Sequence, residues 1–198
     1  MAMVPFDKLG GKLWYNGELV DWDAGRLHIL SHGLHYASCV FEGERAYGGQ
    51  IFKHQEHTDR LFKSAEILGM DIPYSNKELY DAGYDSLNVQ GFKDAYVRAF
   101  AWRGSEMMAI SAQQTTAHLA IAAWEWPSYF DPESKMRGIT LDIASWKRPS
   151  PESAPVHAKA AGLYMICTLS KHEAERKGFQ DALMMDYRGY IAEATGAN

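Results

Sequence analysis

The chain has 198 residues, 46% of them hydrophobic, and a formal net charge of −5, a composition that argues against disorder and gives no sign of a nucleic-acid partner. No stretch approaches the roughly 18 apolar residues of a membrane-spanning helix, and two cysteines are too few for a disulfide framework. We therefore expect a cytoplasmic protein that binds neither nucleic acid nor a membrane.

The first elements in chain order are predicted strands. Residues 13–22 alternate about Asn16 and Gly17, a strong hairpin signal. Residues 35–53 are rich in aromatic and β-branched side chains, which predicts a strand that turns at Gly48 and Gly49 into another.

Two helices are predicted next. From residue 54 to 68 the apolar period becomes that of an amphipathic helix, and Gly69 is placed to end it. Ser75 and Glu78 have the spacing of a capping box, which predicts a second helix through about Val89.

The remaining elements divide the chain into two parts. The strands predicted at 94–102 and 117–126 complete an N-terminal α+β domain over 1–126. Residues 127–138 break the periodicity with prolines, serines and charges, which is typical of an interdomain connection. The part from 139 to 198 is predicted to contain a strand (139–146), a Pro-rich loop (147–155), a helix (161–177) and a hairpin (182–194).

Lys159 stands among small residues just before the second-domain helix. Within one helix, Lys159 and Tyr164 would point about 140° apart. If instead Lys159 ends an extended lead-in, its amine and the phenol can converge, and the neighbouring alanines and Gly162 leave space for a flat group. Partial burial would disfavour the charged amine and make it a better nucleophile toward a carbonyl. The alternative is a surface lysine whose stem covers an apolar patch.

Five segments carry a resemblance to a known family. They are "HGLHYASCVFEGERAY", "HTDRLFKSAEILG", "AYVR", "HAKAAGLY" and "YIAEATGAN". In this order and spacing the chain resembles the class IV (fold-type IV) pyridoxal-phosphate enzymes, most closely the bacterial branched-chain amino acid aminotransferases. The resemblance implies a two-domain α+β fold of the D-amino acid aminotransferase type, with the second domain incomplete.

The resemblance also implies roles for four cofactor-binding residues. Lys159 would hold pyridoxal 5′-phosphate through its amine and then carry the proton between Cα and C4′. Tyr164 would donate a hydrogen bond to the phenolate oxygen, and Glu193 would face the pyridine nitrogen. Arg60 would contact the phosphate, which its planar guanidinium suits.

Substrate contacts are implied for a further set of residues. Tyr96 and Arg98 alternate on one strand, point to the same face, and resemble the pair near the substrate carboxylate. Gly43 permits close approach of backbone and ligand. Glu44 is expected to face away from the pocket. The aromatic residues implied to wall an apolar side-chain pocket are Tyr36, Phe41, Trp126 and Tyr129.

The histidines and the partners complete the expectations. His32 with His35, and His54 with His57, lie three apart, but no ligand set is completed, so we expect no metal and interpret His32 and His35 as structural hydrogen-bonding residues. The implied substrates are amino acids and 2-oxo acids. The implied assembly is a homo-oligomer, either a dimer or a hexamer.

Three functions remain open from the sequence. The preferred one is transamination of leucine, isoleucine and valine with 2-oxoglutarate. Another class IV activity, such as a D-amino acid aminotransferase or an aminodeoxychorismate lyase, would keep Lys159 and Glu193. In the third, these residues are an inactive N-terminal fragment. Because relatives continue past "EATGAN", we expect a truncated chain with weak or absent cofactor binding in isolation.

Overall fold

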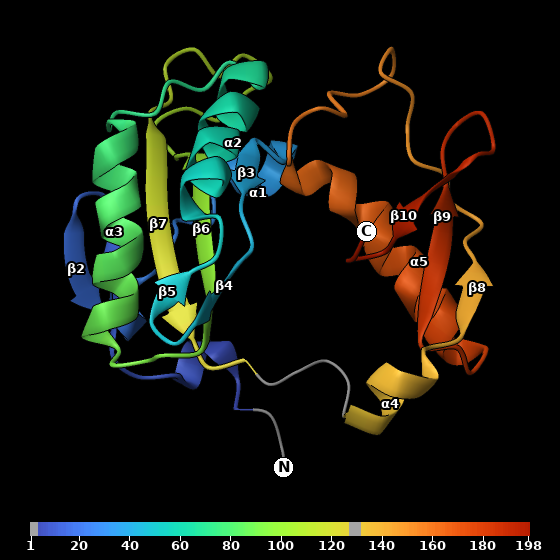
Figure 1. Ribbon diagram of the computed structural model, residues 1–198. Helices are drawn as coiled ribbons and strands as arrows, with labels where there is room; N and C mark the ends of the chain where they lie inside the picture. Colours follow the sequence, from blue (N-terminus) through green and yellow to red (C-terminus); the bar gives the residue numbers. More distant parts are fainter. Residues whose placement is uncertain (1–3, 127–131) are drawn as a thin grey trace. The chain divides into compact units, whose positions relative to one another are not determined.

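The computed structural model describes residues 4–126 and 132–198 and is shown in Figure 1. The chain divides into two compact units. The first is Met1–Trp126 together with Ala158–Ala160, and the second is Pro127–His157 together with Ala161–Asn198. Ala158–Ala160 thus group with the first unit, whereas the sequence assigns them to the second domain. Across the described part of the chain, no helix has the length and apolar character needed to cross a membrane.

Within its described residues, the first unit contains seven strands, two α-helices of 14 residues and three shorter helices. The strands are β1 (Lys12–Tyr15), β2 (Glu18–Asp21), β3 (Cys39–Phe41), β4 (Glu44–Tyr47), β5 (Gln50–Ile51), β6 (Ala95–Arg103) and β7 (Ala117–Trp124). The helices are η1 (Phe6–Lys8), η2 (Trp22–Ala24), α1 (His32–Tyr36), α2 (His54–Ile67) and α3 (Asn76–Val89).

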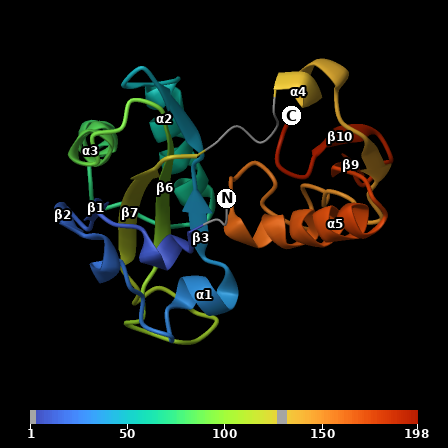
Figure 2. The same ribbon diagram turned by 90° about the horizontal axis from the view of Figure 1, so that it is seen from below.

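The strands form one antiparallel sheet in the order β2-β1-β7-β6-β4-β5, with β3 also paired to β6. α2 and α3 pack along one side of this sheet (Figures 1 and 2). The main core lies beneath them, where Leu61 and Leu87 meet Val97 and Ile121 of the strands. The side chains of β6 that point toward the helices are therefore buried in the core, and the side chains between them point to the opposite face of the sheet.

Local signals account for several boundaries. The predicted hairpin is confirmed, and both of its central residues have positive φ, 47° at Asn16 and 100° at Gly17, as a type I′ turn requires. The Ser75–Glu78 capping box forms at the start of α3. Gly69, with φ of 63°, follows the end of α2 in the left-handed conformation.

The predicted strand at 35–47 is wrong at its beginning and interrupted in its middle. Residues 32–36 form the short helix α1, because His32 and His35 are held by hydrogen bonds from their Nε2 atoms to Ala109 O (2.9 Å) and Ile29 O (2.7 Å). These contacts override the strand preference of the aromatic side chains. The strand then breaks between β3 and β4, which pair with different parts of β6.

The second unit contains a three-stranded sheet in the order β10-β9-β8, in which β8 and β9 are parallel. Its elements are α4 (Pro132–Arg137), β8 (Leu141–Ile143), η3 (Ala161–Tyr164), α5 (Met165–Arg176), β9 (Asp181–Met185) and β10 (Ile191–Ala194). The predicted helix therefore opens with one 3-10 turn, and the predicted strand at 139–146 is shorter than expected.

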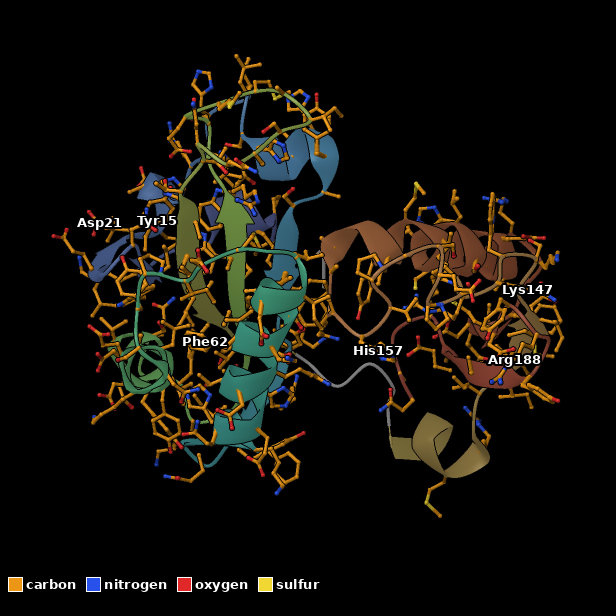
Figure 3. All side chains as sticks on the ribbon, turned by 90° about the horizontal axis from the view of Figure 1, so that it is seen from above. Tyr15, Asp21, Phe62, Lys147, His157 and Arg188 are labelled. Carbon is orange, nitrogen blue, oxygen red and sulfur yellow. The ribbon has the colours of Figure 1, made fainter. Side chains whose placement is uncertain are left out.

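The predicted hairpin at 182–194 is confirmed. Its turn carries Arg188, which is labelled in Figure 3. The guanidinium carbon of Arg188 lies 5.4 and 5.1 Å from the ring centroids of Tyr187 and Tyr190. The apolar core of the second unit is smaller and consists of Ala144, Cys167, Ala174, Ala182 and Met184.

Candidate active site

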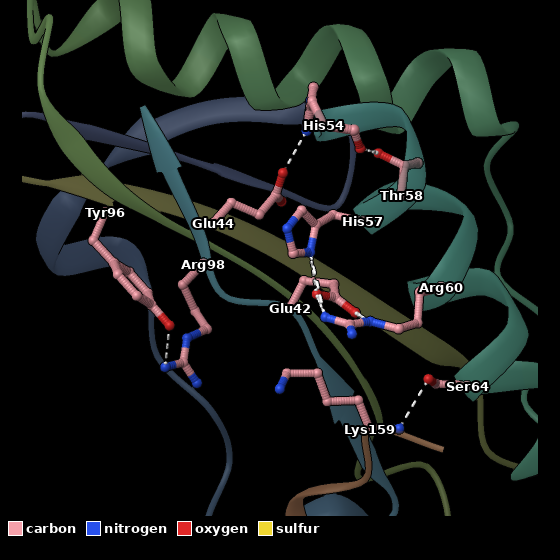
Figure 4. Close-up of polar contacts among 10 residues, drawn as sticks. All are labelled: Glu42, Glu44, His54, His57, Thr58, Arg60, Ser64, Tyr96, Arg98 and Lys159. Carbon is pink, nitrogen blue, oxygen red and sulfur yellow. Dashed lines mark hydrogen bonds and ion pairs between the residues drawn. The ribbon is translucent and has the colours of Figure 1, made fainter. Parts of the chain in front are cut away.

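The free face of β6 carries the predicted carboxylate-binding pair. Along β6, Ala95, Val97 and Ala99 are buried against the helix side, so the residues between them point to the other face. Tyr96 and Arg98 meet there, with Arg98 Nη2 donating to Tyr96 Oη at 2.8 Å (Figure 4). The shared face that the alternation predicts is therefore observed.

Phe41 lies beside this pair and joins it to the predicted cofactor lysine. The guanidinium carbon of Arg98 is 4.5 Å from the Phe41 ring centroid, and Lys159 Nζ is 5.1 Å from the same centroid. Both distances are within the range of cation–π attraction. The first unit thus brings together Phe41, Arg98 and Lys159, which the sequence only suggests separately.

The backbone of Lys159 continues the edge of the sheet next to β3. Phe41 N donates to Lys159 O at 3.1 Å, and Ala160 forms an antiparallel bridge with Val40. On the other side, Lys159 N donates to Ser64 Oγ of α2 at 2.9 Å (Figure 4). Lys159 is half-buried, and the helix begins after it at Ala161, so the predicted extended lead-in is confirmed.

Gly43 occupies the break between β3 and β4, close to Tyr96. A Cβ placed on Gly43 would lie 2.2 Å from Tyr96 Oη, which is too close without movement of the phenol, and 3.2 Å from its Cζ, which is a tight contact. The absence of a side chain therefore permits the phenol to stand where it does.

Arg60, the predicted phosphate contact, is bound to Glu42 by two hydrogen bonds. Arg60 Nε donates to Glu42 Oε1 at 2.6 Å and Nη2 to Oε2 at 2.7 Å, while His57 Nδ1 lies 2.6 Å from Oε2 (Figure 4). Burial acts to raise the pKa of Glu42, but the hydrogen bonds from Arg60 and His57 outweigh it and hold that pKa below its usual value. About half of the Arg60 side chain remains exposed (51%), so the guanidinium is oriented but still reachable.

Glu44 faces the helices, as its alternation with Gly43 predicts. Its side chain is buried, and Oε2 lies 2.6 Å from His54 Nδ1 of α2, whose Nε2 donates to Tyr80 O at 2.9 Å. Burial acts to lower the pKa of His54, but the hydrogen bond and charge of Glu44 prevail and raise it. Glu44 is thus half of a buried ion pair and does not line the face that carries Tyr96.

Of the other aromatic residues predicted to wall the side-chain pocket, Trp126 lies near Tyr96 and Tyr36 lies at the end of α1. The Trp126 ring is tilted against that of Tyr96, with centroids 5.9 Å apart, and the Trp126 carbonyl accepts a hydrogen bond from Arg45 Nη1 at 3.2 Å. Tyr36 is 42% exposed at the end of α1 and packs on His32. Tyr129 lies outside the described residues.

Tyr164 and Glu193 both belong to the second unit, where Arg148 connects their surroundings. Arg148 Nε lies 3.0 Å from Glu193 Oε1, and its Nη1 donates to the carbonyl of Leu163 at 3.1 Å. Tyr164 is the last residue of η3, the 3-10 turn that also contains Leu163, and it packs against the core of this unit. Arg148 therefore links the Glu193 carboxylate to the 3-10 turn that carries Tyr164, and it fixes the position of one relative to the other.

Neither of the two described cysteines is in a disulfide; Cys167 is buried and Cys39 is partly buried. Burial raises the pKa of the Cys39 thiol to about 11, although the nearby Arg98 charge opposes it, and burial also raises the pKa of Cys167. Burial therefore favours the neutral thiol at both positions.

The residues that sequence reasoning missed are the ones that support the predicted set: Glu42, His57, Ser64 and Arg148. The sequence held one signal for Glu42 and its partner His57. Glu42 is an acidic residue in a segment that is otherwise largely apolar, and a carboxylate that becomes buried there needs a hydrogen-bonding partner. For Ser64 and Arg148 the partners, Lys159 and Glu193, lie far away along the chain, and no local pattern identifies them.

Comparisons with known proteins agree with this arrangement. The family model for amino-transferase class IV matches residues 39–198. A probable branched-chain-amino-acid aminotransferase of Rickettsia conorii is 43% identical over 198 residues, covering all of this chain and 67% of the relative. The crystal structure of the Escherichia coli branched-chain amino acid aminotransferase has a TM-score of 0.90 at 35% identity, and 95% of this chain covers 64% of it.

A crystal structure of the T.th. branched-chain amino acid aminotransferase with pyridoxamine 5′-phosphate also has a TM-score of 0.90, at 36% identity, and 95% of this chain covers 63% of it. The chain therefore belongs to the class IV aminotransferases, the fold-type IV class of pyridoxal-phosphate-dependent enzymes. Within that class, the relatives named above are branched-chain amino acid aminotransferases, and this chain spans about two thirds of their length. The resemblance drawn from the five motifs and the fold class it implied are confirmed.

Proposed function

We propose that this protein transaminates branched-chain L-amino acids with 2-oxoglutarate through pyridoxal phosphate bound to Lys159. The observation that carries the proposal is the position of Lys159, half-buried between the buried Ala158 and Ala160, with its amine over the Phe41 ring. A lysine held in this way is suited to react with an aldehyde, because its backbone is fixed and part of its water is removed.

The residues of this chain fit such a cofactor in their chemistry. Arg60 offers an oriented guanidinium for a phosphate, and Glu193 offers a carboxylate for a protonated pyridine nitrogen. Tyr164 offers a phenol for the ring oxygen. Pyridoxal phosphate, when bound, supplies an electron sink for the negative charge that develops at the substrate Cα.

Lys159 has a second role in this proposal. With the cofactor bound, the Lys159 amine would be the group that accepts the substrate Cα proton and returns it, acting as base and then as acid. Within the second unit, Arg148 would keep the Glu193 carboxylate in place for a pyridine nitrogen, since its Nε lies 3.0 Å from Oε1.

The face of β6 is proposed to bind the substrate. Within the described residues, Arg98 Nε is buried without a hydrogen-bond partner, a cost that an approaching carboxylate would remove. Tyr96 presents its hydroxyl beside it. Phe41, Tyr36, Trp126 and Tyr129 are proposed as apolar walls, which favour leucine, isoleucine and valine over charged side chains.

The first test compares two lysine substitutions. Lys159→Ala is expected to abolish the yellow, borohydride-sensitive adduct formed with added pyridoxal phosphate and to abolish transamination of leucine. Lys63→Ala removes an exposed lysine that is paired with Glu66 on α2, and it should change neither. If the Lys159→Ala protein still forms the adduct and transaminates leucine, the proposal is wrong.

A second test separates the substrate classes. A panel of L- and D-amino acids is assayed with 2-oxoglutarate as acceptor, and L-leucine, L-isoleucine and L-valine are expected to be the preferred donors. Activity with D-alanine but not with L-leucine would instead indicate a D-amino acid aminotransferase. Release of pyruvate from aminodeoxychorismate would indicate the lyase.

The assembly and location of the protein are part of the same proposal. We propose a homo-oligomer, a dimer or a hexamer, that works in the cytoplasm, where its two free thiols stay reduced. Light scattering tests the assembly. The expectation of weak or absent cofactor binding by the isolated 198 residues stays a prediction, and an intact mass near 22.3 kDa together with full activity would contradict it.

A further inference from the structure

Ser64 is an unusual side chain for its position in α2. It is only 1% exposed, and its neighbours in the helix, Leu61 and Ala65, belong to the apolar core. A hydroxyl in such a place is unfavourable unless it is hydrogen-bonded, and serine is a weaker helix former than alanine. Alanine would therefore suit both the helix and the core better, so the hydroxyl must have a local use.

That use is a hydrogen bond to the backbone of Lys159. Ser64 Oγ accepts from Lys159 N at 2.9 Å, while Lys159 O accepts from Phe41 N at 3.1 Å. The two bonds engage the amide and the carbonyl of the same residue, and together they restrict the direction in which its side chain leaves the backbone. Figure 4 shows the Lys159 side chain running from this point toward Arg98, below the Glu42–Arg60 pair.

The same helix also carries Arg60. Ser64 follows Arg60 by four residues, so the two lie on one face of α2, separated by about 6 Å of helical rise. Arg60 is held in turn by Glu42 of the segment between β3 and β4. One rigid element therefore bears both the guanidinium proposed for the phosphate and the hydroxyl that holds the lysine.

We propose that Ser64 is a positioning residue for Lys159. Its hydroxyl fixes the lysine backbone against α2, and in this way it sets where the lysine side chain begins relative to Arg60 on the same helix. The inference depends on the proposed role of Lys159 as the residue that bonds pyridoxal phosphate.

The test compares two buried serines. Ser64→Ala removes the hydroxyl that contacts Lys159. Ser86→Ala is the matched control, because Ser86 is also fully buried in a helix of the same unit, but its hydroxyl donates to Ala82 O and Ile121 O. Ser64→Thr keeps the hydroxyl and is expected to restore whatever Ser64→Ala loses.

The first measurement needs no cofactor. Hydrogen exchange at the Lys159 amide, followed by NMR, is expected to be about tenfold faster in Ser64→Ala, the effect of losing one hydrogen bond, and unchanged in Ser86→Ala. The second measurement is the rate at which pyridoxal phosphate becomes attached to Lys159, trapped by borohydride and located by mass spectrometry. This rate is expected to fall about tenfold in Ser64→Ala only.

The outcomes separate this inference from the proposed function. Unchanged amide exchange in Ser64→Ala, or an equal loss of attachment rate in Ser86→Ala, overturns the role of Ser64. These measurements use the protein as the cell produces it. If pyridoxal phosphate never becomes attached to Lys159 in that wild-type protein, the proposed function is wrong and this inference is wrong with it. Restoration of both measurements by Ser64→Thr supports the positioning role.

Discussion

Arg60 and Glu42 are joined by two parallel hydrogen bonds of 2.6 and 2.7 Å, and the carboxylate is completely buried while the guanidinium remains half exposed. This geometry turns a flexible surface side chain into an oriented one, because the buried partner cannot move without leaving its charge unpaired. The pair ties α2 to the segment that follows β3. The Arg60–Glu42 pair should therefore contribute to the free energy of unfolding, and that contribution should depend on pH.

Glu42→Gln is expected to lower the free energy of unfolding by about 3 kcal/mol at pH 7, because it leaves Arg60 and His57 without their buried counter-charge. The pKa of Glu42 is lowered in the folded state, so its stabilisation is present above the usual value of 4.5 and is lost as pH falls through the folded-state pKa. The difference between the two proteins should shrink in acid. Urea unfolding from pH 7 to pH 3 checks this, with the exposed Glu66→Gln as control, and a difference independent of pH would contradict it.

Glu44→Gln is expected to show the opposite trend. The pKa of His54 is raised above its usual 6.5 in the folded state, so its stabilisation is complete below that pH and is lost as pH rises through the folded-state pKa. The variant should lose on the order of 3 kcal/mol at pH 6 and less at pH 9. The same urea titration extended to pH 9 measures it, and Glu42→Gln serves as the comparison with the reverse slope.

Gly43→Ala is expected to displace the Tyr96 phenol, because the added Cβ would lie 2.2 Å from Tyr96 Oη. We expect the KM for leucine to rise roughly tenfold, equivalent to about 1.4 kcal/mol of binding. Tyr96→Phe lacks the clashing oxygen, so Gly43→Ala should cost less in that background. Steady-state kinetics on the four proteins of this cycle test the contact, and equal effects in both backgrounds would exclude it.

Leu61→Ala is expected to destabilise the first unit by about 2–5 kcal/mol, because Leu61 is 1% exposed in the core beneath α2 and its loss leaves a cavity. Val89→Ala, at the exposed end of α3, is the control and should change stability by less than about 0.5 kcal/mol. Thermal unfolding followed by circular dichroism distinguishes the two. Similar melting temperatures for both variants would show that the core does not depend on Leu61.

The elements that could be predicted are those whose cause lies within a few residues. Asn16 and Gly17 accept the positive φ of a hairpin turn, and Ser75 and Glu78 satisfy the first amides of α3. The strand predicted at residues 35–38 is wrong because its conformation depends on a contact far away along the chain. There the chain is helical and then left-handed at Ala37, because His32 is held by a carbonyl 77 positions away.

The sequence by itself determined the family and the alternation that puts Tyr96 and Arg98 on one face, and it singled out Lys159 as the candidate for the cofactor, because motif spacing and strand period are local properties of the chain. Only the tertiary structure decided three hydrogen bonds. Glu42 accepts from Arg60, the buried Glu44 pairs with His54, and Ser64 accepts from the backbone amide of Lys159. These contacts join segments 10 to 95 positions apart. These contacts form because folding packs α2 against the segments that carry Glu42, Glu44 and Lys159, and polar groups that become buried between them must be hydrogen-bonded.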